Sequence, residues 1–140
     1  MEISTQQVAQ DLFQLLDRVK ICALSLAEAQ GLTRVQLFAL YSISLHGELA
    51  MRQAADVLHC DASNVTGIVD RLVNQQLITR EENVRDRRTK NLRLTDKGTQ
   101  IVHTLQEALP AKLNCEKLSA EERQTLHRIT EKLCTIEAAE

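Results

Sequence analysis

Apolar residues recur at helical spacing along most of the chain. From Val8 to Leu26 an apolar residue follows every three or four positions, which predicts one long amphipathic helix. Gly31 is suited to end this helix, because glycine accepts the left-handed backbone that helix ends often need. The Thr33–Gln36 segment fits a capping box, in which the two side chains cap each other's backbone, and it predicts a second helix over about 34–45.

Two shorter helical patterns follow a break at 46–49. The first covers 51–58, and Asp61 is a good N-cap for the second. The second pattern has a continuous apolar side, formed by Val65, Ile68, Val69, Leu72 and Val73. Its other side is polar and begins with small residues, and we single out Ser63, Asn64, Thr66, Gly67 and Arg71. Small polar residues at the start of an exposed helix let its backbone approach DNA closely, as major-groove recognition requires, although helix-turn-helix spacing alone also fits a merely solvated face.

The pattern then changes to that of a β-hairpin. The chain leaves the helix for a strand over 75–80, and 91–95 alternates apolar and polar residues as a returning strand. A further helix is predicted from Asp96, with a kink or break near Pro110. A last helix follows a second capping box at Ser119–Glu122. The fold class is therefore mainly α with a small β-hairpin.

Apolar seams occur in the helices at both ends of the chain. The last helix repeats the spacing of the first, with Leu126, Ile129, Leu133 and Ile136. One domain of this size needs few such seams for its own core, so we expect the terminal helices to interlock in a homodimer. A monomeric bundle that uses the same stripes is the alternative.

Positive charge is concentrated in the loop of the hairpin. Between Arg85 and Arg93 there are five cationic side chains and one carboxylate, a local charge of +4 in a chain whose net charge is -2. Such a loop can be a solvated charged segment. Beside a helix with a small polar face it indicates instead a local footprint that neutralises DNA phosphates.

Composition and short motifs narrow the classes of protein to which this chain could belong. The 140 residues indicate one domain, with no signal peptide and no apolar run near the length of a membrane span, so we expect a cytoplasmic protein without membrane contact. The four cysteines form no CxxC pair and are expected to be reduced and mostly buried, and the three aromatic residues Phe13, Phe38 and Tyr41 are expected in the core. No nucleophile or phosphate-loop motif is present, and His103 with Glu107 is only a two-ligand pair, so we expect no enzyme, cofactor or metal site.

Four segments together resemble one family. They are Asp61-Ala-Ser-Asn-Val-Thr-Gly-Ile-Val-Asp-Arg-Leu72, Leu77-Ile-Thr-Arg80, Asp86-Arg-Arg-Thr-Lys90 and Leu94-Thr-Asp-Lys-Gly98. The chain resembles the MarR family of bacterial transcriptional regulators, most specifically in the Asp-x-Arg pattern followed by Leu-Thr-x-x-Gly. The resemblance implies a winged helix-turn-helix flanked by N- and C-terminal dimerisation helices. Residues 1–140 would form one MarR-like domain, with dimerisation helices at about 1–30 and 100–140 and a DNA-binding lobe at about 33–98.

The resemblance also implies roles for the residues singled out above. The helix from Asp61 would enter the major groove, where Asn64 can read adenine, Ser63 and Thr66 can contact bases or phosphates, and Arg71 can reach a phosphate or a guanine. In the wing, Arg88 would enter the minor groove with Asp86 orienting it through a charge-assisted hydrogen bond. The other wing cations, Arg85, Arg87 and Lys90, would hold phosphates. The partner would be double-stranded DNA with a pseudo-palindromic operator.

The mode of regulation is less determined by the residues. The family resemblance implies a small-molecule effector bound between the dimerisation helices and the lobe, and a repressor that this ligand releases. A thiol-switched regulator is an alternative: Cys22 lies within the first apolar seam, and Cys60 lies just before the recognition helix, where oxidation would disturb DNA contact. Another alternative is a winged-helix module that binds protein and not DNA.

Overall fold

A computed structural model describes residues 2–135 of the chain. Helices dominate it, as predicted, and a small antiparallel sheet lies within the lobe. The elements in chain order are α1 (Thr5–Ala29), α2 (Arg34–His46), β1 (Leu49–Ala50), α3 (Met51–Leu58), α4 (Ala62–Asn74), β2 (Ile78–Glu82), β3 (Lys90–Leu94), α5 (Asp96–Lys112), the 3-10 turn η1 (Cys115–Lys117) and α6 (Ala120–Cys134).

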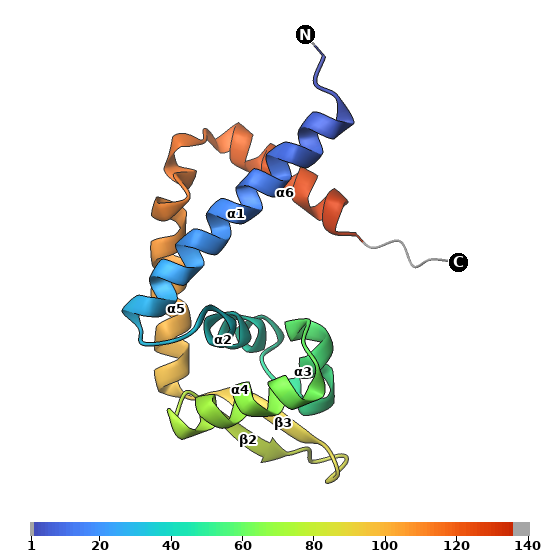
Figure 1. Cartoon of the computed structure of the whole chain (residues 1–140), viewed down its shortest axis with the longest axis vertical. Coiled ribbons are helices and arrows are strands. Elements are labelled where there is room, and N and C mark those ends of the chain that lie inside the picture. Colours follow the sequence, from blue (N-terminus) through green and yellow to red (C-terminus); the bar gives the residue numbers. More distant parts are fainter. Residues whose placement is uncertain (1, 136–140) are drawn as a thin grey trace, which may run out of the picture.

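The elements separate into a lobe and a pair of outlying helices. Figure 1 shows α2, α3, α4 and the β2–β3 hairpin gathered at one end of the molecule. The start of α1 and all of α6 lie toward the other end, where they overlap in this view, and α5 leads from the lobe to α6. This is the arrangement of a winged helix-turn-helix with terminal helical extensions, so the predicted fold class is confirmed. No helix within 2–135 is long and apolar enough to span a membrane.

The sheet ties the hairpin to the entrance of the helix-turn-helix. Its strand order is β1-β3-β2, and both pairings are antiparallel. The hairpin strands pair from Ile78 with Leu94 to Glu82 with Lys90, which confirms the predicted hairpin but places its first strand at Ile78–Glu82 and not at 75–80. The two-residue strand β1 was not predicted, because a strand of this length has no alternation to detect. By pairing with β3, it places the start of α3 beside the hairpin.

Local capping explains where the helices begin and end. Both predicted capping boxes are present, at Thr33 with Gln36 and at Ser119 with Glu122. The end of α1 closes as a Schellman motif, in which the Leu32 N–H donates to the Ala27 carbonyl and the Gly31 N–H donates to that of Glu28. Gly31 has a φ of 69°, so the expected role of this glycine is confirmed.

The hydrophobic core lies inside the lobe and along α5. Its largest fully buried side chains are Leu40, Ile43, Leu72, Leu77, Ile78, Leu92, Val65 and Val69. They come from α2, α4, the sheet and the segment between α4 and β2, and the buried Val102 and Leu105 of α5 extend the core toward the outlying helices. The apolar side of α4 is therefore fixed against the core, which turns its polar side outward.

The apolar stripe of α1 divides into two parts. In the C-terminal half, Ala27 is buried and Cys22 and Leu26 are half-buried, since this half packs on α2 and α5. The N-terminal half exposes its apolar side chains, and α6 contains no buried residue. We call this uncovered set the terminal apolar surface: Val8, Leu12, Leu15, Leu16, Leu126, Ile129 and Leu133. Ile136, the last residue of the predicted seam, lies outside the described residues.

The interruption expected near Pro110 follows it closely, because α5 includes Pro110 and ends at Lys112. Two expectations about burial were wrong. Phe13 and Phe38 are not core residues, with exposed fractions of 72% and 46%, and only Tyr41 is half-buried. The cysteines are less buried than expected: Cys22, Cys60 and Cys115 are half-buried and Cys134 is exposed. Composition could not reveal this, because burial of a small or apolar residue depends on its place on the helix.

Candidate nucleic-acid interface

The start of α4 is held by its N-cap, Asp61. The carboxylate accepts hydrogen bonds from the Asn64 backbone N–H at 2.9 Å and from the Ser63 hydroxyl at 2.8 Å. These two bonds, the backbone one foremost, lower the pKa of Asp61 below its ordinary value. An ionised cap at a helix N-terminus is also favoured by the helix dipole. The first turn of α4 is therefore rigidly formed before any ligand arrives.

The polar side of α4 is exposed as predicted. It consists of Ser63, Asn64, Thr66, Gly67 and Arg71, which face away from the buried Val65, Val69 and Leu72. No side-chain hydrogen bond of Asn64 and no ion pair of Arg71 occurs within the described part of the chain, so both groups are available to a ligand. The hydroxyl of Ser63 donates to Asp61, and that of Thr66 donates to the Ala62 carbonyl at 3.1 Å. These two hydroxyls can accept a hydrogen bond as they stand, but they must rotate to donate one.

An ion pair that sequence reasoning missed holds α4 against the hairpin. Arg80 of β2 donates through Nη2 to the Asp70 carboxylate on α4. The pair links the helix to β2, and both side chains remain partly exposed. Nothing in the sequence signals it, because oppositely charged residues on two different elements are recognisable only when the packing is known.

The tip of the wing is preorganised by two short side chains. The Asn83 side-chain oxygen accepts from the Arg85 N–H at 2.8 Å, and the Asp86 carboxylate accepts from the Arg88 N–H at 3.1 Å. Such Asx turns fix the backbone locally, and the Asn-x-x-Asp spacing was a signal that could have identified Asn83. The expected contact of Asp86 is corrected here: it orients the backbone of Arg88 and not its guanidinium. The Arg88 side chain projects from a fixed backbone and is exposed.

The wing cations fall into two groups. Arg85, Arg87 and Arg88 are exposed, and none of them makes an ion pair with any residue in 2–135. Lys90, which is expected to hold a phosphate, is paired in this structure with Glu82 at 3.0 Å between Nζ and Oε1. The net charge counted along the sequence is therefore larger than the unpaired positive charge of the folded wing, because carboxylates on neighbouring strands neutralise part of it.

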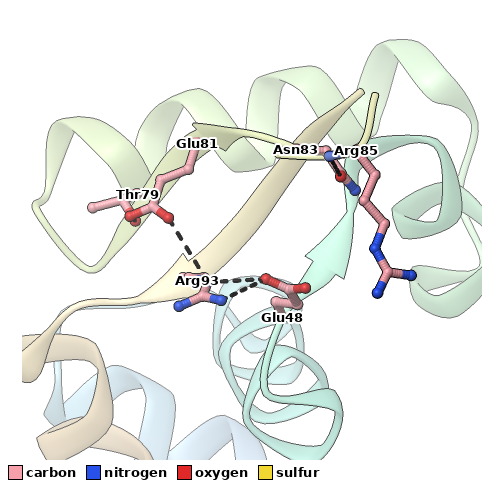
Figure 2. A network of polar contacts seen from close by, with 6 residues as sticks. All are labelled: Glu48, Thr79, Glu81, Asn83, Arg85 and Arg93. Atoms are coloured by element: carbon pink, nitrogen blue, oxygen red, sulfur yellow. Dashed lines mark hydrogen bonds and ion pairs between the residues drawn. The ribbon is translucent and has the colours of Figure 1, made fainter. Parts of the chain in front are cut away.

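Arg93, like Lys90, is paired with carboxylates, and its ion pairs connect parts of the sheet. Figure 2 shows its guanidinium between two carboxylates, those of Glu48 and Glu81. The Arg93 Nη2 lies 2.8 Å from Glu48 Oε2, and its Nε lies 3.7 Å from Glu81 Oε2. The hydrogen bond and charge of Glu48, followed by the charge of Glu81, raise the pKa of Arg93. Since Glu48 directly precedes β1, this cluster links the entrance of the helix-turn-helix to both strands of the wing.

The two cysteines considered as switches lie apart. The Cys22 Sγ is 3.8 Å from the Lys112 carbonyl oxygen, within the contact of α1 with α5. Cys60 is half-buried against the core just before α4. Within residues 2–135 no three His, Cys, Asp or Glu side chains gather closely enough to hold a metal ion.

The folded lobe therefore presents two features side by side. One is an exposed helix that begins with small polar residues, and the other is a wing tip whose backbone is held by two Asx turns and which carries three arginines without carboxylate partners in the described part of the chain. Together they can hold a polyanion with two adjacent grooves, because one element can enter each groove.

Comparisons with known proteins agree with this geometry. A model of the MarR family matches residues 32–90. The chain is 39% identical over 84 residues to the HTH-type transcriptional repressor MdtR of Bacillus subtilis (strain 168), covering 60% of this chain and 54% of MdtR. The chain spans less than two thirds of the length of the curated relatives that it matches.

Solved structures extend the likeness to the whole fold. The YusO protein of Bacillus subtilis is 33% identical, covers 96% of this chain and 99% of its own length, and superposes with a TM-score of 0.61. A mutant of MarR from E. coli, complexed with operator DNA, superposes with a TM-score of 0.68 at 22% identity, covering 91% of this chain and 93% of that one.

Proposed function

Because the chain belongs to the MarR family, we propose that it is a sequence-specific double-stranded DNA-binding regulator of transcription. The observation that carries the proposal is the exposed polar face of α4 beside the three arginines of the wing tip. The name of MdtR, a transcriptional repressor, supports repression as the outcome. In this proposal the chain acts by occupying DNA and not by catalysis.

The proposed reading of DNA assigns a groove to each element. The α4 face of Ser63, Asn64, Thr66, Gly67 and Arg71 lies in the major groove, and Arg88 enters the adjacent minor groove. Arg85 and Arg87 contact phosphates, which fixes the register without reading sequence. Gly67 supports this placement because an added side-chain carbon there would meet no protein atom within 4 Å, so the chain's own packing does not require glycine. Close approach of a ligand to the helix backbone gives a reason for it.

The proposal is tested first by selecting bound fragments from the source genome with purified protein. We expect the selection to recover a pseudo-palindrome bound about a thousandfold more tightly than random duplex. The measurement is the Kd for both duplexes at about 0.15 M salt, since affinities for DNA depend steeply on ionic strength. Weak binding that is equal for all sequences would contradict the proposed function and would favour a protein-binding winged helix.

Replacing Asn64 with alanine is expected to reduce specific binding more than nonspecific binding. The Asn64 amide has no side-chain partner among the described residues, and a bidentate contact to adenine contributes about 1–3 kcal/mol of discrimination. The affinity of N64A for the operator should therefore fall about tenfold while its affinity for random duplex stays the same. Equal losses on both duplexes would reduce Asn64 to a positioning role.

The regulator is proposed to be a homodimer joined through the terminal apolar surface. The residues Leu126, Ile129 and Leu133 are 42%, 44% and 55% exposed, although they form the apolar side of an amphipathic helix. A 15-residue helix that buries nothing is marginal in water, so α6 needs a partner surface. A second copy of the chain offers the same apolar residues in the twofold-symmetric arrangement that most homodimers use.

A charge placed in the terminal apolar surface is expected to dissociate the dimer. Ile129→Glu should convert the protein to monomer and lower operator affinity, because a dimer reads two half-sites and a monomer reads one. Analytical ultracentrifugation over a range of protein concentrations measures the mass. Gln100→Glu adds the same charge at an exposed site of α5 outside this surface and serves as the control. A monomeric wild type, or an I129E variant that remains dimeric, would contradict the interface.

Release by a small-molecule effector completes the proposal. Exposed apolar side chains on α1 and α2, among them Phe13 and Phe38, are available to contact such a ligand between the terminal helices and the lobe. Cys22, Cys60, Cys115 and Cys134 are free thiols in this structure. A thiol-switched regulator of the same family is the alternative to release by a ligand.

A further inference from the structure

A groove lies between the wing and the two helices of the helix-turn-helix. It has a volume of about 420 Å³ and is lined by residues of three elements and the wing loop: α3 contributes Met51, Arg52 and Ala55, α4 contributes Ala62, Val65 and Thr66, and the wing contributes Arg88, Thr89 and Lys90. We call it the wing–helix groove. The pairing of β1 with β3 forms it, because this pairing sets the first turn of α3 opposite the end of the hairpin.

The polar residues of the wing–helix groove are mostly cationic. Arg52, Arg88 and Lys90 come from separate parts of the chain and converge on it. Arg52 is exposed and makes no ion pair with any residue in 2–135. Its position at the second residue of α3 carried no signal in the sequence, because the cations of the wing lie far from it along the chain. The floor is formed by small and apolar side chains, which leave room beside the cations.

The proposed docking requires a strand of DNA to pass through this place. If α4 lies in the major groove and the wing tip lies in the adjacent minor groove, the sugar-phosphate backbone that separates the two grooves must run between α4 and the wing. We propose that the wing–helix groove is the seat of this backbone strand and that Arg52 is a DNA-binding residue that clamps one of its phosphates. The inference rests on the proposed function, and it adds one residue of α3, Arg52, to the DNA-contacting residues, at the place where the first helix of a helix-turn-helix crosses the DNA backbone.

Glu82 modulates this seat. Its carboxylate holds the Lys90 ammonium at 3.0 Å, so Lys90 can bind a phosphate only by leaving Glu82 or by keeping a carboxylate close to the DNA. Either way, Glu82 opposes the binding of the strand. Arg88 is assigned to the minor groove, so the cations of the wing–helix groove left for the strand are Arg52, which is ready to bind, and Lys90, which is restrained.

Arg52→Ala tests the proposal in the full-length protein. We expect its affinity to fall about tenfold at about 0.15 M salt for operator and random duplex alike, because a phosphate contact carries no sequence information. The slope of log K against log salt should become smaller by about 1. Lys117→Ala, which removes an exposed cation of η1 at the other end of the chain, is the matched control and should change neither value (Figure 1).

Ethylation interference locates the strand. One ethylated phosphate between the bases read by α4 and the minor-groove site of the wing should block the wild type and should no longer discriminate for R52A. Glu82→Gln should raise affinity a few-fold by releasing Lys90, and an unchanged affinity would remove Lys90 from the seat. A wild type that binds no duplex would refute the proposed function itself. A wild type that binds, with R52A unchanged in affinity and salt slope, would overturn only the wing–helix groove as a strand seat.

Discussion

Arg88→Ala is expected to weaken operator binding by about tenfold or more at about 0.15 M salt and to reduce the salt slope by about 1. The Arg88 guanidinium is exposed and has no carboxylate partner in 2–135, while its backbone is held by Asp86. The side chain therefore loses little freedom on entering the narrow groove, where the negative potential is strongest. Fluorescence anisotropy of a labelled operator, titrated between about 50 and 200 mM salt, measures both quantities.

A variant that keeps the positive charge distinguishes the contribution of the charge from that of the guanidinium contacts in the minor groove. Arg88→Lys should keep most of the salt slope but not all of the affinity, because the compact, strongly hydrated ammonium cannot reproduce the contacts of the planar guanidinium. An affinity of R88A that equals that of the wild type across the whole salt titration would rule out the minor-groove role.

Gly98→Ala is expected to cost about 3 kcal/mol of stability, at the upper end of the usual cost of overpacking. A Cβ on Gly98 would overlap the Leu77 carbonyl oxygen and would lie 3.1 Å from the carbonyl carbon. The same oxygen accepts the Thr95 N–H, so α5 cannot move away without breaking the contact that joins it to the hairpin. For a domain of this size the Tm should fall by about 10 °C. Thermal unfolding at one fixed protein concentration measures it, since an oligomer's Tm depends on concentration.

Gly67→Ala is the matched control for this effect. A Cβ there meets no protein atom within 4 Å, and removing glycine from a helix interior stabilises it by about 1 kcal/mol. G67A should therefore melt at or above the wild-type temperature and yet bind operator less well, because the added methyl group lies on the proposed DNA-contacting face. A Tm of G98A close to that of the wild type would mean that α5 does not pack so tightly on Leu77.

Most helix and strand positions could be predicted from the sequence because their signals are local. The Thr33 and Ser119 capping boxes, the Asp61 cap and Gly31 act within a few residues of themselves, and each is confirmed in the structure. The alternation of apolar and polar residues around Leu92 and Leu94 likewise predicted the returning strand. The strand β1 was not predicted because it has only two residues, and only their pairing with β3 identifies them as a strand.

The candidate interface was predictable in its residues but not in its charges. Each residue of the α4 face and of the wing tip is exposed where the pattern placed it. The partners of Lys90 and Arg93 were not predictable, because Glu82, Glu48 and Glu81 reach them only after the strands pair. The position of Arg52 beside the wing cations was not predictable either, because only the folded groove brings them together.

Helical period, strand alternation and capping depend on neighbours in the chain, so the helices, the hairpin, the outward face of α4 and the basic wing tip could be predicted from the amino-acid sequence alone. Packing of the elements fixes which cations remain unpaired among the described residues, which half of the α1 stripe α2 and α5 cover, and the exposure of Phe13 and Phe38. Ion pairing and burial act between groups that are close in space, and the chain brings those groups together only when its elements pack.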